Sequence, residues 1–144
     1  MSLADGLRGL TRVFLDTAPL IYYVESSQPF AALVDPLADR LEQGSIVGVT
    51  SPITLAESLV VPFQNSSDLY RQIFFDLITA GPGIEFAPTT ELIAQRAAEI
   101  RARSGLKLLD AIQAATAIST GCEAIVTNDR VFLRVPKMAV LLVQ

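Results

Sequence analysis

The sequence contains no histidine and only one cysteine, Cys122. Without histidine, the protein cannot use a Ser-His-Asp triad, a Cys-His pair or acid–base catalysis by paired histidines. With a single cysteine it forms no internal disulfide, and a tetrahedral zinc site has almost no ligands to draw on. The low cysteine content fits a reducing compartment, so we expect a cytoplasmic protein.

Long uncharged segments are also missing, although 51% of the residues are hydrophobic. The longest uncharged stretch, Gln43 to Ala56, contains two glycines and a proline and is too short to span a bilayer. Charged residues recur between Asp5 and Asp16, which leaves no room for the apolar part of a signal peptide. We therefore expect no membrane association and one ordinary domain over residues 1–144.

The sequence is rich in carboxylates, with 15 Asp and Glu residues against 11 Lys and Arg residues. Carboxylate oxygens are suitable ligands for hard divalent cations such as Mg²⁺ and Mn²⁺. If the protein is an enzyme, this composition favours a metal ion held by acids as its catalytic reagent.

Short apolar segments alternate with helical ones along the chain. We predict strands at Arg12–Asp16, Ile46–Val49, Ile84–Ala87, Ala124–Thr127 and Met138–Val143. Helices are predicted at Thr17–Glu25, Phe30–Gln43, from Ser51-Pro52 onward, and at Ser67–Ala80, Thr89–Arg103 and Leu106–Thr120, with a break at Ser26–Pro29. Strands that are apolar on both faces and separated by helices predict a three-layer α/β/α sandwich around a mostly parallel sheet of about five strands.

Four acids lie at strand ends or in the first turns of the helices that follow. Asp16 ends the first strand, and Asp129 comes two residues after the fourth. Glu57 falls in the second turn of the helix after the second strand, and Asp110 in the opening turns of its helix. Ligands of open parallel sheets bind outside the carboxyl ends of the strands. The four acids could therefore face one another at one edge of the sheet.

Each acid also has an ordinary structural explanation. Asp16 could cap the next helix, Glu57 could be a solvated surface residue, and Asp129 follows Asn128 in a common turn pair. One exposed helix face would explain a polar stripe at spacings of three: Lys107, Asp110, Gln113 and Thr116. Only the joint pattern of the four acids favours a metal site.

The joint pattern resembles the PIN-domain family and, within it, the VapC-type toxins of bacteria and archaea. Four segments carry the resemblance in the order of the family: Phe14–Tyr22, Thr54–Leu59, Leu109–Ala117 and Ile125–Asp129. The last two segments are fairly specific together, while the first two are weak singly. A mild departure is Ala18, where many members have a polar residue.

The resemblance implies a domain that cleaves single-stranded RNA with Mg²⁺ or Mn²⁺. It assigns the catalytic, metal-binding acids to Asp16, Glu57, Asp110 and Asp129, with Thr127 and Asn128 as supporting polar residues. We expect Asp16 and Asp110 to be the principal ligands, directly or through water, while Glu57 and Asp129 complete the coordination sphere and orient the nucleophilic water. Attack by water would leave a 5′-phosphate and a 3′-hydroxyl.

The net charge of −4 and the pI near 4.7 are unusual for an RNA-binding protein. The four proposed ligands account for the whole imbalance, since the remaining acids and bases are equal in number. Six cations lie near the predicted acids in the sequence: Arg96, Arg101, Arg103 and Lys107 before Asp110, and Arg130 and Arg134 beside Asp129. Three of them are candidate RNA contacts: Arg103, Lys107 and Arg130. Ordinary solubilising charge explains any one of them as well.

The resemblance also implies a homodimer that binds a small antitoxin protein. Two apolar runs, Leu20–Tyr23 and Val60–Phe63, fit an association surface, although a dense core explains them nearly as well. Three other functions stay open: a PIN-like nuclease in RNA processing, an aspartate-based phosphoryl-transfer protein, and a non-catalytic binding domain. A phosphoryl-transfer protein of that class usually has a second acid two residues after the catalytic Asp, whereas here the residue two after Asp16 is Ala18. The four retained acids count against a non-catalytic binding domain.

Overall fold

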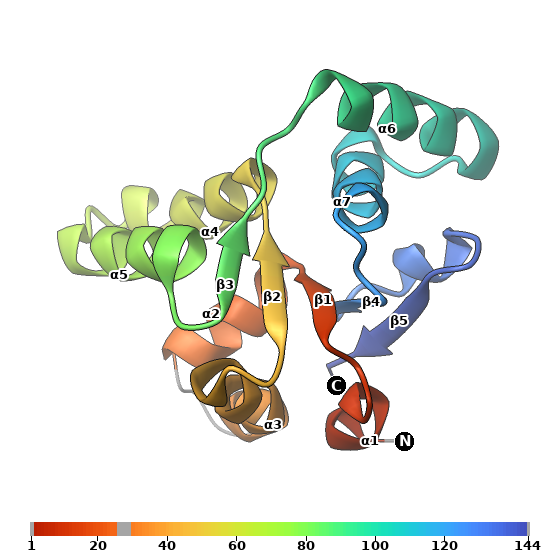
Figure 1. Cartoon of the computed structure of the whole chain (residues 1–144). Coiled ribbons are helices and arrows are strands. Elements are labelled where there is room, and N and C mark those ends of the chain that lie inside the picture. The colour runs from red at the N-terminus through yellow and green to blue at the C-terminus, as the bar shows by residue number, and fades with distance from the viewer. Residues whose placement is uncertain (1, 26–29, 144) are drawn as a thin grey trace.

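The structure is a computed structural model that describes residues 2–25 and 30–143 (Figure 1). Strands lie at β1 Arg12–Leu15, β2 Val47–Thr50, β3 Ile84–Phe86, β4 Ala124–Thr127 and β5 Ala139–Leu142. Helices lie at α1 Leu3–Leu7, α2 Thr17–Glu25, α3 Phe30–Gln43, α4 Pro52–Gln64, α5 Asp68–Ala80, α6 Glu91–Ser104 and α7 Leu108–Ser119, with the 3₁₀ helix η1 at Arg130–Arg134.

The five strands form one sheet in the order β3-β2-β1-β4-β5, and all neighbouring strands are parallel. β1 is central, with Val13 paired to Gly48 of β2 on one side and to Ala124 of β4 on the other. Parallel strands covered on both faces are continuously apolar rather than alternating. This explains why β1 contains Val-Phe-Leu and β4 contains Ala-Ile-Val.

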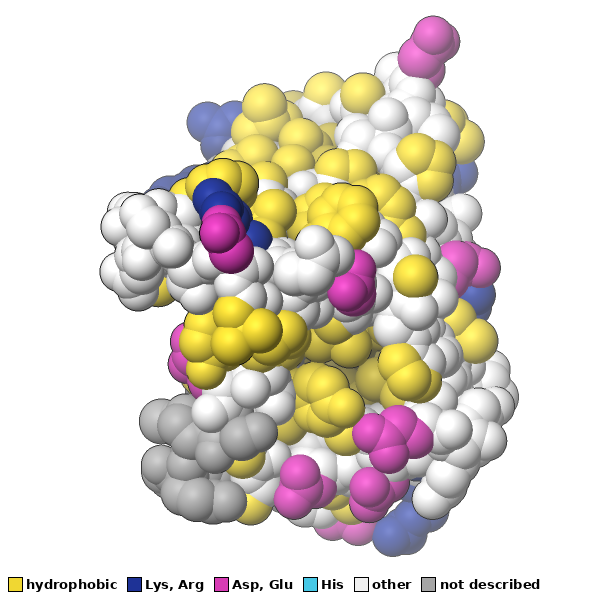
Figure 2. Space-filling model, turned by 90° about the vertical axis from the view of Figure 1, so that its left-hand side faces the viewer, with side chains coloured by type: hydrophobic (Ala, Val, Ile, Leu, Met, Phe, Trp, Pro, Cys, Tyr) yellow, Lys and Arg dark blue, Asp and Glu magenta, His cyan; other side chains and the backbone are white. Residues whose placement is uncertain are grey.

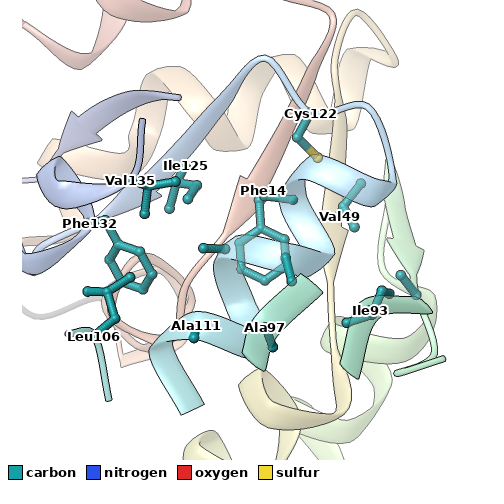
Figure 3. Packing of buried hydrophobic residues seen from close by; sticks show 14 residues of the cluster. Phe14, Val49, Ile93, Ala97, Leu106, Ala111, Cys122, Ile125, Phe132 and Val135 are labelled. Carbon is teal, nitrogen blue, oxygen red and sulfur yellow. The ribbon is translucent and has the colours of Figure 1, made fainter. Parts of the chain in front are cut away.

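Alternate residues of the central strand pack into two separate cores. Successive side chains of a strand point to opposite faces of the sheet. Val13 and Leu15 pack with residues of α2, α3 and α5, whereas Phe14 packs with residues of α6, α7 and η1. Figure 3 shows Phe14 in the second of these cores, near Ala97 of α6 and Ala111 of α7. Helices α2 to α5 lie on one side of the sheet and α6 and α7 on the other, which gives three layers (Figure 1).

Local sequence signals set the helix ends that position the candidate acids. Ser51 is the N-cap of α4, and its hydroxyl accepts hydrogen bonds from the backbone amides of Ile53 and Thr54. α6 ends at Gly105, whose φ of +74° is a left-handed conformation that glycine adopts without strain. This turn leads the chain into α7. The two signals therefore fix where the helices that carry Glu57 and Asp110 begin.

The structure confirms the predicted three-layer α/β/α sandwich, and each predicted strand lies within one residue of the observed one. Two short helices, α1 and η1, were not predicted, because neither is long enough to show an apolar repeat. The predicted break at Ser26–Pro29 lies outside the described residues. Among the helices that are described, none combines the length and the apolar character needed to cross a membrane.

Candidate active site

The candidate site lies where the connections of the sheet diverge. The chain leaves β1 through α2 and α3 to reach β2, whereas α6 and α7 carry it from β3 back past β1 to β4. β1 and β4 are therefore neighbours whose connections lie on opposite faces of the sheet. In an open parallel sheet this divergence leaves a crevice at the carboxyl ends of the two strands. Asp16 directly follows β1, and Asp129 lies two residues after β4.

Asp16 is held by groups from the neighbouring strand. Its backbone amide donates to the carbonyl of Val126 over 3.0 Å, and the Thr127 hydroxyl donates to its Oδ2 over 2.7 Å. Burial raises the pKa of Asp16, and the charge of Asp129 raises it further; hydrogen bonds from Thr127, the Thr17 amide and Gln113 act in the opposite direction. The structure thus orients this carboxylate while removing it partly from water.

Thr127 links Asp16 to Asp129. Its Oγ1 donates to Asp16 and also accepts a hydrogen bond from the backbone amide of Asp129 over 3.0 Å. Asp129 in turn caps η1, because its Oδ1 accepts from the amide of Val131 over 3.0 Å. The exposed Asn128 side chain points elsewhere and donates to the hydroxyl of Tyr22 over 2.9 Å. Of the two supporting residues that the sequence suggested, Thr127 therefore contacts the acids, whereas Asn128 joins the loop to α2.

Glu57 and Asp110 reach the same edge from the helices on either face of the sheet. Glu57 accepts a hydrogen bond from the Thr17 hydroxyl over 3.3 Å, and burial followed by the charge of Asp16 raises its pKa. Asp110 lies in the first turn of α7, and its pKa is raised by burial and then by the charges of Asp129 and Asp16. Each acid is thus within the electrostatic reach of others in the set.

The four carboxylates share an edge but do not form a closed set of ligands in this structure. Among the residues described, no three His, Cys, Asp or Glu side chains are arranged so that together they could hold a metal ion. The oxygen-only donor set at the carboxyl ends of β1 and β4 nevertheless matches the ligand preference of Mg²⁺ or Mn²⁺.

A buried glutamine connects the elements that carry three of the acids. Gln113 of α7 accepts a hydrogen bond from the Ser51 hydroxyl over 2.5 Å and donates to Thr54 Oγ1 over 2.8 Å. Thr54 in turn donates to the carbonyl of Leu15, the residue before Asp16, over 3.2 Å. The network therefore joins α7, α4 and β1. Gln113 lies one helical turn from Asp110, and Thr54 lies one helical turn from Glu57.

The interpretation that Asp110 lies on one exposed polar face of its helix, together with Lys107, Gln113 and Thr116, is wrong. Gln113 and Thr116 are only 1% and 0% exposed, whereas Asp110 is half-buried and Lys107 is exposed. The stripe turns inward because α7 packs closely on the sheet through small residues that are fully buried: Ala111, Ala114, Ala115 and Ala117. That alanine pattern was visible in the sequence and could have indicated a helix covered on more than one side.

Two hollows of different character flank the acidic edge. On the α4 side, a hollow of about 400 Å³ is lined by Glu57 together with mainly apolar residues, among them Ile21, Val61, Tyr70 and Phe74. On the α7 side, a hollow of about 330 Å³ is lined by Gly105, Lys107, Asp110, Asp129, Val131 and Arg134. Of these two hollows, the one on the α7 side is lined by cations, Lys107 and Arg134, and the one on the α4 side is not.

The candidate RNA contacts from the sequence lie at different distances from the acids. Lys107 lines the same hollow as Asp110 and Asp129, and its charge lowers the pKa of Asp110. Arg103 is at the end of α6, paired with Glu99 over 3.2 Å with both side chains largely exposed. Arg130 is exposed at the start of η1. Arg134, which the sequence places beside Asp129 but which was not among the three candidate RNA contacts, lines the acidic hollow itself.

Several solved structures share this fold. VapBC2 from Rickettsia felis, bound to a fragment of promoter DNA, has a TM-score of 0.70 at 18% identity, covering 90% of this chain and 97% of that chain. A toxin–antitoxin complex from Klebsiella pneumoniae has a TM-score of 0.64 at 25% identity, covering 88% and 95%. VapC20 from Mycobacterium tuberculosis, a toxin that cleaves the sarcin–ricin loop, has a TM-score of 0.63 at 14% identity, covering 78% and 86%.

The sequence matches no curated protein, but it does match a family model. The model of the PIN domain covers residues 13–138, which run from β1 to the residue before β5 and include all four acids. The family resemblance that the sequence suggested is confirmed by this match: the chain belongs to the PIN-domain family.

Proposed function

We propose that this protein is a nuclease that hydrolyses single-stranded RNA with Mg²⁺ or Mn²⁺ bound by Asp16, Glu57, Asp110 and Asp129. The observation that carries the proposal is the gathering of these acids from four separate segments at the divergence of β1 and β4. Burial and mutual repulsion raise the pKa values of three of them. Repelling carboxylates weaken a fold, and such groups concentrate at functional sites.

The chain's own groups have distinct tasks in this chemistry. The Thr127 hydroxyl donates to Oδ2 of Asp16 and orients this carboxylate as a metal ligand. Glu57 and Asp129 are more exposed than Asp16 and can orient a water for attack on the phosphate. A bound divalent cation supplies charge neutralisation at the phosphate and activation of the water, which makes histidine dispensable. Attack by water leaves a 5′-phosphate and a 3′-hydroxyl.

Cleavage of end-labelled single-stranded RNA tests the proposal. Activity should require Mg²⁺ or Mn²⁺ and stop when a chelator is in excess. Asp110→Asn, which is nearly isosteric, should abolish cleavage. Asp76→Asn is the matched control, because Asp76 is an exposed acid on α5 that bonds only Gln72. Cleavage that continues undiminished in excess chelator, or that both substitutions reduce equally, would refute the mechanism.

We propose further that the protein is the toxin of a toxin–antitoxin pair and forms a homodimer. The similar structure from K. pneumoniae is a toxin–antitoxin complex. Large apolar side chains that the sequence left undecided between core and surface are exposed on α4, where Val60, Val61 and Phe63 are 51%, 54% and 59% exposed. Figure 2 shows apolar side chains gathered on this face of the molecule. Such exposure is typical of an association surface.

A small antitoxin would fit the hollow on the α4 side of the acids. Its apolar lining leads to Glu57, so a segment bound there could place an arginine against the carboxylates. Co-expression with the product of a small neighbouring gene, followed by size-exclusion chromatography with light scattering, tests this proposal. A protein that stays monomeric and has no such neighbour would contradict the toxin assignment while leaving the nuclease proposal intact.

A further inference from the structure

The cations of the described chain differ in whether they already have a partner. Most Lys and Arg residues pair with an acid or hydrogen-bond to a neighbouring group of the chain, as Arg12 does with Glu85 and Arg40 with backbone carbonyls. Within residues 2–25 and 30–143, four cations make no ion pair or hydrogen bond: Lys107, Arg130, Arg134 and Lys137. All four lie in or beside η1 and the start of α7, so positive charge is left available on one side of the acidic edge.

Arg134 connects the acidic edge to a second, basic hollow. It lines the hollow with Asp110 and Asp129, and it also lines a neighbouring hollow of about 370 Å³ between α6, α7 and η1. That hollow contains Arg96 and Arg103, and Glu99 is the only acid in its lining. The Arg96 guanidinium is fixed there by a hydrogen bond to Ser119 Oγ over 3.1 Å. A polyanion could thus pass from the acids over Arg134 to two further arginines.

The opposite flank offers no such path. The hollow on the α4 side is lined by Glu25, Glu57 and mainly apolar side chains, and it contains no Lys or Arg. A phosphodiester chain entering from that flank would meet carboxylates without compensating cations. Because the affinity for a nucleic-acid backbone comes from Lys and Arg, the favourable direction is towards η1 and α6.

We propose that the hollow between α6, α7 and η1 binds the phosphates of the RNA strand on one side of the cleaved bond. Arg134 would bind the phosphate next to the site, and Arg103 and Arg96 would bind phosphates farther along. The Arg103–Glu99 pair is no obstacle, since both side chains are largely exposed and such pairs contribute little. This inference rests on the proposed function, because it takes the cleaved phosphate to lie at the four acids.

The planar guanidinium group binds phosphate and carboxylate alike, so an acidic protein segment is the competing occupant. Continuity with the acidic edge favours RNA. A strand whose cleaved phosphate lies at Asp110 and Asp129 must continue past Arg134 or turn towards the cation-free flank. A carboxylate peptide extending from the basic hollow would instead run into the acids.

Binding of a fluorescent single-stranded RNA, followed by anisotropy over a range of salt concentrations, tests the proposal. The measurements use an Asp110→Asn background, so that the RNA stays intact. Adding Arg103→Gln and Arg134→Gln should weaken binding by on the order of tenfold or more. The plot of log affinity against log salt concentration should become shallower, with the magnitude of its slope reduced by about 1.4, or about 0.7 for each lost phosphate contact. Arg8→Gln is the control, because Arg8 follows α1 as its C-cap residue, before the amino end of β1, and its side chain is 81% exposed and paired with Asp5.

Substrate length gives a second readout in the cleaving protein. RNAs extended on only the 5′ or only the 3′ side of the mapped cleavage site should differ in KM. The two arginine substitutions should raise KM for one of these series and not for the other. Thermal melts check that the variants are folded, which we expect because both arginine side chains are exposed.

The outcomes separate this inference from the proposed function. Arginine variants that bind RNA like the Arg8→Gln control would overturn the strand site, even if the parent cleaves RNA with metal. If the arginine substitutions weaken binding to polyglutamate but not to RNA, the strand site would be overturned in favour of a site for an acidic protein partner. A parent that binds RNA through these arginines but never cleaves it with Mg²⁺ or Mn²⁺ would refute the nuclease proposal and support the strand site.

Discussion

Replacing Gln113 by leucine would test whether a buried amide sets the geometry of the acidic edge. The two side chains are similar in size, but leucine can neither accept from the Ser51 hydroxyl nor donate to Thr54 Oγ1. It also removes the hydrogen bond from Gln113 that lowers the pKa of Asp16. The substitution therefore disconnects α7 from α4 while the apolar packing around the position is largely kept.

The loss of stability can be estimated from the two hydroxyl groups left behind. Ser51 and Thr54 are fully buried, so neither hydroxyl can replace the lost partner with water. A buried polar group that loses its hydrogen bond costs about 1–3 kcal/mol, but both hydroxyls keep other bonds, so we expect a total of about 2–4 kcal/mol. For a chain of 144 residues this corresponds to a fall in Tm of roughly 6–12 °C.

The effect on cleavage should be mainly on kcat. Asp110 lies one turn before Gln113 on α7, and Glu57 lies one turn after Thr54 on α4, so loosening this joint changes how the acids face one another. A displacement of about 1 Å in a catalytic group can reduce turnover on the order of a hundredfold. The KM for RNA should stay close to that of the parent, because no proposed RNA contact is altered. Initial rates at saturating metal, well below the Tm of the variant, measure both quantities.

Thr116→Val is the matched control for this substitution. Thr116 is also fully buried on α7, but its hydroxyl donates only to the Ile112 carbonyl of its own helix over 2.7 Å. Its loss should lower stability slightly and leave kcat unchanged. If Gln113→Leu and Thr116→Val have the same kcat as the parent while both are folded, Gln113 is a packing residue and the reasoning about the acidic edge is wrong.

Three further predictions concern the charges and surface of the protein. The pKa of Asp110 is higher in the folded than in the unfolded state. Its ionisation therefore lowers the free energy of unfolding as the pH rises from the lower to the higher of these two pKa values, and this loss of stability persists at neutral pH. Without metal, Asp110→Asn should therefore have a Tm at or above that of the parent at pH 7, and this advantage should disappear below about pH 4. Saturating Mg²⁺ or Mn²⁺ should raise the Tm of the variant less than that of the parent, and equal metal-induced shifts in Tm would exclude Asp110 from the site. Thr127→Val removes the donor to Asp16 and should weaken metal binding about tenfold or more by calorimetric titration, whereas an unchanged affinity would show that Thr127 serves only the fold. Phe63→Glu places a charge on the exposed apolar face and should convert the expected dimer to monomers in light scattering; a dimer that persists would move the interface elsewhere.

The layers and the edge at which the acids gather could be predicted because they follow from the order of the elements. Continuously apolar strands such as Ala124–Thr127 are recognisable without knowledge of their neighbours, and parallel strands place their carboxyl ends together. Asp16 and Asp129 could therefore be assigned to one edge from their positions alone. Glu57 and Asp110 required only that the helices after β2 and before β4 begin at Ser51-Pro52 and near Lys107.

The internal connections of the site could not be predicted in the same way. Gln113 and Thr116 have the polarity of surface residues, and only the close approach of an alanine-rich helix to the sheet buries them. Side-chain polarity indicates the preferred environment of a residue, but a buried polar group is stable when tertiary partners satisfy it. The sequence places Arg134 near Asp129, but its position in the acidic hollow could not be predicted, because η1 is too short to show a periodic pattern and begins at the Asp129 cap.

The acidic edge therefore combines rigid attachment with electrostatic strain. Asp16 is fixed by Thr127, and the helices that carry Glu57 and Asp110 are joined through Gln113 and Thr54. These bonds hold like charges near one another, whereas flexible attachment would let the carboxylates separate and relax. A cation bound between these carboxylates would relieve their repulsion, which would favour its binding to the folded protein. The same arrangement explains why RNA would need Arg134 and its neighbours, because the carboxylates repel the phosphates of the substrate before a cation is present.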